Sequence, residues 1–125
     1  MASFANTQSD PDVDFAPYFA SGSIANATNA TITFDNVTEW VKLTCPSTGD
    51  AAHALCVGVT TSGVEGTQRM AIPANTNSGE IPMRVKQLVI RGGGSTCGYQ
   101  IVAVLRRQAS SDYPDITTAN GFEGV

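Results

Sequence analysis

The segment VTEWVKLTC, residues 37–45, has a strict two-residue repeat. In an extended chain it places Val37, Glu39, Val41, Leu43 and Cys45 on one side and Thr38, Trp40, Lys42 and Thr44 on the other. This alternation is typical of a β-strand with one buried face. The residues that follow, PSTGD at 46–50, are typical of a turn. The segment therefore predicts a strand that ends at a turn.

Similar short segments lie on both sides of this strand, separated by residues that favour turns. The predicted strands cover residues 22–28, 30–35, 37–45, 53–60, 67–72, 83–91 and 97–106. Strands that recur about every 8–12 residues are typical of a sandwich or a barrel. No segment has the pattern of an amphipathic helix. We expect an all-β fold, a compact antiparallel and jelly-roll-like β-sandwich of six to eight short strands.

Two segments carry further information about packing. In 53–60, Leu55, Val57 and Val59 fall on one face. In 83–91, the alternation slips by one residue between Lys86 and Leu88. A slip of this kind indicates either a β-bulge or a strand that is covered on both faces.

Composition and charge limit the function. Charged residues make up 14% of the chain, where about 25% is usual. The net charge of −4 argues against a non-specific nucleic-acid binder, which needs a basic surface. No apolar run reaches the roughly 20 residues that cross a membrane as a helix. We therefore expect neither a nucleic acid nor a membrane as partner.

The two ends of the chain differ from its middle. Six of the eleven acidic residues lie in residues 1–20 and 111–125, which contain no Lys or Arg. Both ends also contain prolines that interrupt regular structure. We therefore divide the chain into an N-terminal arm (1–20), a β-sandwich domain (21–108) and a C-terminal arm (109–125). The expected partner-binding residues are the large apolar ones of the arms: Phe4, Phe15, Tyr18, Phe19, Tyr113, Ile116 and Phe122.

The residues that could support catalysis are few and scattered. The only histidine, His53, lies beside a turn and has no acidic neighbour in the sequence that would complete a catalytic triad. The acids between the arms do not form a pair like that of a glycosidase. The segment Gly92-Gly93-Gly94 lacks the Lys-Ser/Thr of a phosphate-binding loop and is expected to be a flexible connection. We expect no catalytic residues and no enzyme.

The cysteines leave a metal site and a disulfide to consider. Cys45, His53, Cys56 and Cys97 could supply four zinc ligands, but they lack the paired C-x2-C spacing of a zinc site. A bridge between Cys45 and Cys56 is conceivable around the turn at 46–50. The first residues lack the features of a secretory signal, so we expect buried, reduced thiols and no metal or other cofactor.

Three segments together carry a resemblance to a known group of proteins. They are FDNVTEWVKLTC (34–45), LCVGVTTSGVEGT (55–67) and MRVKQLVIRGGGSTCGYQIVAVL (83–105). In composition and pattern they resemble the decoration or cement proteins, and similar minor structural proteins, of tailed bacteriophages. The resemblance implies a β-sandwich, often a homotrimer, on the outer capsid surface of the virion. It also implies that extended arms bind neighbouring subunits of the major capsid protein.

Two other classes of protein remain as alternatives. A carbohydrate- or receptor-binding β-sandwich would use an exposed aromatic residue, with Trp40 and Tyr99 as the candidates. A small zinc protein would use the cysteines and His53. Exposed aromatic residues beside amide or acid side chains favour the first class, and bound metal favours the second.

Overall fold

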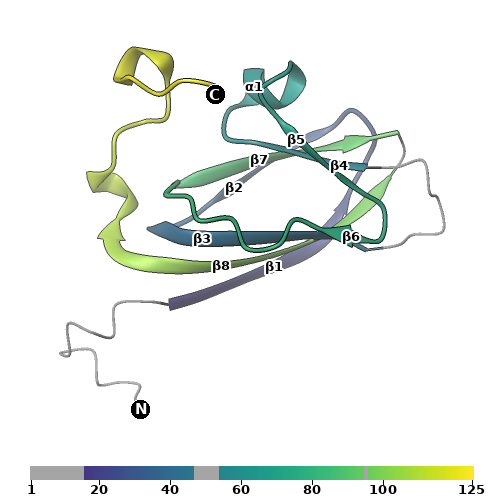
Figure 1. The fold of residues 1–125 in the computed structure, drawn as a ribbon, viewed down its shortest axis with the longest axis horizontal. Helices are drawn as coiled ribbons and strands as arrows, with labels where there is room; N and C mark the ends of the chain where they lie inside the picture. The colour runs from purple at the N-terminus through teal and green to yellow at the C-terminus, as the bar shows by residue number, and fades with distance from the viewer. Residues whose placement is uncertain (1–15, 47–53, 95) are drawn as a thin grey trace.

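A computed structural model describes residues 16–46, 54–94 and 96–125. Two antiparallel sheets of four strands each pack face to face (Figure 1). Strand accounts for 56% of the structure and helix for 11%. The predicted all-β fold, a compact antiparallel β-sandwich, is confirmed.

The first sheet has the strand order β1-β8-β3-β6. Its strands are β1 (Ala16–Ile24), β8 (Cys97–Ala109), β3 (Asn36–Cys45) and the two-residue β6 (Thr76–Asn77). β8 is the long central strand, and it pairs with β1 over the full length of β1. Residues 16–20, which were assigned to the N-terminal arm, therefore belong to a strand of the sandwich.

The second sheet has the strand order β2-β7-β4-β5. Its strands are β2 (Asn29–Thr33), β7 (Gln87–Gly93), β4 (Ala54–Gly58) and β5 (Met70–Pro73). β7 begins at Gln87, four residues later than predicted. The residues before it cross from the first sheet to the second, because the carbonyls of Val85 and Lys86 accept hydrogen bonds from the amide of Thr38 in β3 and that of Phe34 directly after β2.

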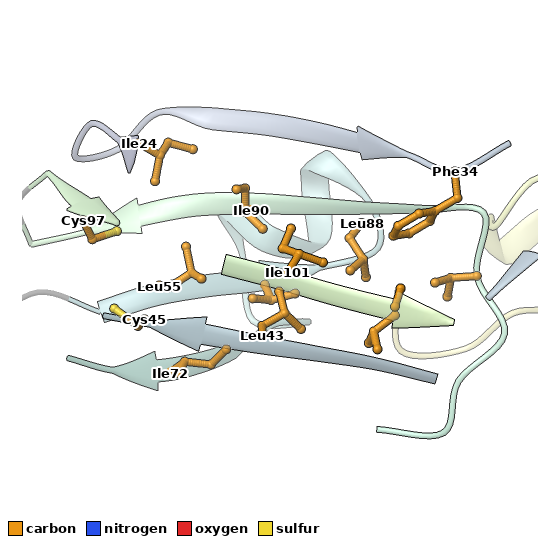
Figure 2. Packing of buried hydrophobic residues seen from close by; sticks show 14 of the residues in the cluster. Ile24, Phe34, Leu43, Cys45, Leu55, Ile72, Leu88, Ile90, Cys97 and Ile101 are labelled. Carbon is orange, nitrogen blue, oxygen red and sulfur yellow. The ribbon is translucent and has the colours of Figure 1, made fainter. Parts of the chain in front are cut away.

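The core lies between the two sheets and is made of the inward residues of the alternating strands. Leu43 and Ile101 of the first sheet face Leu55 and Ile90 of the second (Figure 2). Each of these side chains is at most 1% exposed. Burying an aliphatic side chain of this size stabilises a fold by about 1.5–3 kcal/mol, so these contacts hold the sheets together.

The slip in the alternation of β7 comes from a strand that is covered on both faces. Leu88 and Ile90 point into the core, whereas Val89 points to the other side and is still only 1% exposed. There it packs with Cys56 of β4 and Val64 of α1 (Thr61–Glu65). The sequence predicted a turn at the position of this short helix.

A β-bulge in β3 changes the face on which two residues lie. The register between β3 and β8 shifts on both sides of Thr38. As a result Thr38 is fully buried and Glu39 is not, the reverse of the predicted alternation. The buried Oγ1 of Thr38 accepts a hydrogen bond from the Val85 amide at 3.0 Å and donates to the Met83 carbonyl at 2.8 Å. These bonds satisfy the hydroxyl in the interior.

Gly92 is part of a strand rather than of a flexible loop. It lies in β7, forms a bridge with Asn26 and is buried. A Cβ atom at this position would lie 2.3 Å from the carbonyl oxygen of Ala25. The chain of the β1–β2 connection can pass this close only because residue 92 has no side chain.

Candidate interaction surface

The cysteines are buried and are not arranged as a reactive site. Cys45 and Cys97 belong to the core between the sheets, whereas Cys56 lies under α1 on the other side of the second sheet. All three are free thiols, so the conceivable Cys45–Cys56 bridge is absent. Burial raises the pKa of the Cys45 and Cys97 thiols, which disfavours the reactive thiolate.

The zinc site considered from the sequence would combine His53 with the three cysteines. His53 lies outside the described residues. Within the described ranges, no three His, Cys, Asp or Glu side chains lie close enough together to hold a metal ion.

The expected anchors of the C-terminal arm pack against their own sandwich. Ile116 is 7% exposed and belongs to the core cluster, and Tyr113 and Phe122 pack against that cluster. The rings of Tyr113 and Phe122 also contact each other, with centroids 6.2 Å apart. The expectation that these side chains bind a neighbouring subunit stays a prediction, and Ile116 has little free surface for such a contact because it is buried in its own chain.

Polar contacts hold the C-terminal segment in this position. Lys86 Nζ lies 2.6 Å from Asp115 Oδ1 and donates to the Tyr113 carbonyl at 3.0 Å. Tyr113 Oη donates to the Arg84 carbonyl at 3.0 Å. The hydrogen bond and charge of Lys86 lower the pKa of the Asp115 carboxyl. The segment then runs to α1, where the C-terminus lies (Figure 1).

The expected anchors at the other end of the chain are found in different surroundings. Phe4 and Phe15 lie outside the described residues. Tyr18 points inward from β1, and its ring packs edge-on against Phe34 with centroids 4.9 Å apart. Phe19, the next residue, points outward and is 71% exposed. Among the described anchors, Phe19 is thus the one whose side chain is mostly free to bind a partner.

Phe19 belongs to a largely apolar surface on the outer side of the first sheet. The strand register aligns Pro17 with Val104 and Trp40 in one row across β1, β8 and β3, and Phe19 with Val102 and Lys42 in the next. The inward neighbours of these rows, such as Val41 and Ala103, are fully buried in the core. We call this surface the bare face, defined as Pro17, Phe19, Trp40, Lys42, Val102 and Val104.

A hollow with a mixed polar and apolar lining adjoins the bare face. The next row along the same strands contains Ser21, Gln100 and Thr44. Between Phe19 and this row the surface is hollowed by about 350 Å³, lined chiefly by Phe19, Ser21, Gln100 and Val102. The large ring of Phe19 thus stands directly beside a depression whose floor includes the small Ser21 and the polar Gln100.

The bare face contains one of the two aromatic residues considered for carbohydrate binding. Trp40 is half-buried on it, beside Val104. Tyr99 instead packs against the core, with its ring beside Gly22. The sequence contained a signal for this face, because a strand with Ile101 and Ala103 inward must present Val102 and Val104 outward. The large aromatic residues of the arms gave a stronger signal for partner binding than these two valines.

Fold and surface together define a small β-sandwich with an uncharged open edge strand and an apolar sheet face. No known protein family and no curated protein matches the sequence. A solved structure described as Bacillus endospore appendages that form disulfide-linked pili resembles the chain with a TM-score of 0.44 and 13% identity. That likeness covers 74% of this chain and 88% of the other.

The Yersinia pseudotuberculosis-derived mitogen is a second solved structure that resembles the chain. The TM-score is 0.42 and the identity 13%, over 82% of this chain and 95% of the mitogen. Across the described ranges, none of the helices has the length and apolar character needed to span a membrane.

Proposed function

We propose that this chain is a non-catalytic structural protein that attaches to the outer surface of a tailed-bacteriophage capsid. It binds neighbouring subunits of the major capsid protein and strengthens the seams between them. The observation that carries the proposal is the bare face, a largely apolar surface on the outer side of the first sheet. The resemblance of residues 34–45, 55–67 and 83–105 to decoration and cement proteins supplies the identity of the partner.

The contacts of the bare face are suited to a protein surface. Trp40 and Val104 are half-buried within the sheet and Pro17 is exposed, so a flat partner can cover all of them together. Large aromatic and aliphatic side chains at the centre of an interface contribute most of its binding energy. Lys42, in the neighbouring row with Phe19 and Val102, can pair with an acidic side chain of the partner and set the orientation.

In this proposal the C-terminal arm has a different role from the partner binding that the sequence predicted. The C-terminal segment is held by Ile116 and by the Lys86–Asp115 ion pair of its own chain. In the proposal it therefore stabilises the domain, and the bare face makes the attachment. Phe4 and Phe15 remain candidate contacts to the capsid.

The proposal is tested by binding to particles that lack this protein. Val104→Asp places a charge at the centre of the bare face, and we expect it to weaken binding at least roughly tenfold, about 1.4 kcal/mol. Thr33→Asp, on the exposed surface of β2, is the matched control and should bind like the wild type. The measurement is co-sedimentation of labelled protein with the particles, after thermal melting has shown that both variants are folded.

Two results would count against this function. If Val104→Asp binds the particles as tightly as the wild type, the bare face does not make the attachment. If the chain binds no particle but binds an oligosaccharide, and Trp40→Ala abolishes that binding, the carbohydrate-binding alternative replaces the proposal.

A further inference from the structure

We propose that two copies of this chain associate by pairing their β1 strands antiparallel around a two-fold axis at Ala20. The pairing joins the two first sheets into one continuous sheet. It places Phe19 of each copy in the hollow beside Phe19 of the other. This contact is between copies of the chain and does not depend on a capsid.

The edge formed by β1 is open to such pairing. β1 is the terminal strand of its sheet, and within the described residues its strand partner is β8 alone (Figure 1). Its nine residues, APYFASGSI, carry no charge, and the single proline lies near the start at Pro17. The register with β8 is unbroken from Ala16 to Ile24, so no bulge twists the edge away. Edge strands are normally protected from pairing by charge, proline or a bulge, and residues 18–24 have none of these.

The side chains of β1 fit their own two-fold copy. In an antiparallel pair centred on Ala20, Phe19 lies directly opposite Ser21 of the second copy. Ser21 lines the hollow next to Phe19, so each ring enters the hollow of the other copy. The two Phe19 rings become diagonal neighbours on one face, a separation that aromatic side chains can bridge. Phe19 and Ser21, which lines the hollow, lie two residues apart on the same edge strand. A two-fold axis at Ala20, the residue between them, therefore brings each ring opposite the hollow of the other copy.

This self-complementarity identifies a second copy as the occupant. A two-fold interface uses the same patch on both partners, so a protruding group must meet a hollow within that patch. The neighbouring residues Ala20, Ser21 and Gly22 are small and let a second strand approach. The absence of charge on β1 means that the pairing brings no like charges together.

Within the described residues, a second large hydrophobic side chain is exposed, and it offers a matched control. Met70 is 39% exposed and lies on β5, the terminal strand of the second sheet. β5 has four residues and ends in Pro73, which cannot donate a hydrogen bond to an added strand. Replacing Met70 therefore removes exposed apolar surface from an edge strand without touching the proposed interface.

The first test measures the mass of the purified full-length chain by sedimentation equilibrium over a range of concentrations. We expect a monomer–dimer equilibrium that Phe19→Ser weakens by roughly tenfold or more, because the ring loses its burial. Met70→Ser should leave the dissociation constant unchanged. A wild type that stays monomeric, a trimer such as the phage resemblance implies, or a dimer insensitive to Phe19→Ser would each overturn the proposal.

The second test fixes the register. Phe19→Cys and Ser21→Cys are prepared as separate proteins, mixed and oxidised, and the native cysteines stay protected because they are buried. A mixed disulfide between the two variants is expected, since residues 19 and 21 face each other across the axis. The mixture of Phe19→Cys with Ser23→Cys is the control and should cross-link far less. Equal cross-linking of both mixtures overturns the proposed register.

Neither experiment contains particles, so their failure leaves the attachment to a capsid untouched. Conversely, a dimer that forms through Phe19 but does not bind capsids would separate the two proposals. Val104→Asp lies in the other row of the bare face and serves as a folded variant that should still dimerise.

Discussion

The outer faces of the two sheets carry similar apolar side chains but meet different surroundings. On the second sheet, Val89 and Cys56 point outward and are covered by α1. On the first sheet, Val102 and Val104 point outward from the central strand β8 and are only half-buried. The comparison shows that an apolar residue on the outward side of a strand has two explanations. Either the chain covers it with its own segment, or it is available to another molecule.

A pair of identical substitutions tests this difference and should give the largest effect on stability. Val89→Asp buries an unpaired charge under α1, and we expect it to lower the free energy of unfolding by at least about 3 kcal/mol. Val104→Asp, on the bare face, should cost no more than about 1 kcal/mol. Urea unfolding of both variants measures the two costs. Equal losses would mean that the bare face is as enclosed as the covered one.

The sequence predicts the strands of this architecture better than it predicts the segments that pack over them. The two-residue alternation located the strands because it is a local property of Val37–Cys45 and its counterparts. The bulge at Thr38 could not be predicted, because it is favoured by hydrogen bonds to Met83 and Val85, about 45 residues away in sequence. The slip in the alternation before Leu88 indicated a β-bulge or a strand that is buried on both faces. The fold shows that α1 buries the second face of β7.

The same limit explains the C-terminal segment. Its proline, Pro114, and its acids predicted an irregular arm, and an irregular segment can lie equally well on its own domain or on another. The C-terminal segment lies on its own domain because Ile116 packs into the core and Asp115 forms an ion pair with Lys86. Both contacts depend on residues that are distant in the sequence. Phe19 was among the predicted anchors, but its half-buried neighbours Val102 and Val104 were not.

The second prediction concerns this segment. Ile116→Ala removes a side chain that is 7% exposed, and we expect a loss of about 2–3 kcal/mol in the free energy of unfolding. The expectation from the sequence, that Ile116 binds a neighbouring subunit, implies an unchanged stability of the isolated domain. Thr118→Ala, at an exposed position two residues later, is the control for substitution in the same segment. Thermal and urea unfolding of the purified domain distinguish the two outcomes.

The third prediction examines how firmly α1 covers the second sheet. The Thr60 side chain accepts a hydrogen bond from the Gly63 amide at 2.9 Å and caps α1. Thr60→Ala should cost about 1 kcal/mol, and local opening should speed the labelling of Cys56 by roughly fivefold.

Mass spectrometry of thiol labelling in the native state measures the effect residue by residue. Cys45 and Cys97 are internal controls, because they lie between the sheets and opening α1 does not expose them. If all three thiols gain reactivity together, the substitution loosens the whole sandwich and α1 is not an independent cover.

The smallest expected effect is the pH dependence of the contact between Lys86 and Asp115. The side chain of Asp115 is 79% exposed, so solvent screens the pair, and its contribution should appear only as a small shift of the unfolding midpoint. The folded state lowers the pKa of this carboxyl, so the pair stabilises the fold at a pH above the unfolded pKa of about 3.9. The stabilisation is lost as the pH falls through the lowered folded pKa.

The measurement compares the unfolding midpoints of the wild type and Asp115→Asn between pH 7 and pH 2. The difference should be present at pH 7 and approach zero at the acidic end, where both carry a neutral side chain at residue 115. High salt should reduce the difference at pH 7. Asp112→Asn removes an exposed acid three residues earlier and controls for net charge. A difference that persists unchanged at pH 2 would show that Asp115 holds the C-terminal segment by its shape and neutral hydrogen bonds rather than by its charge.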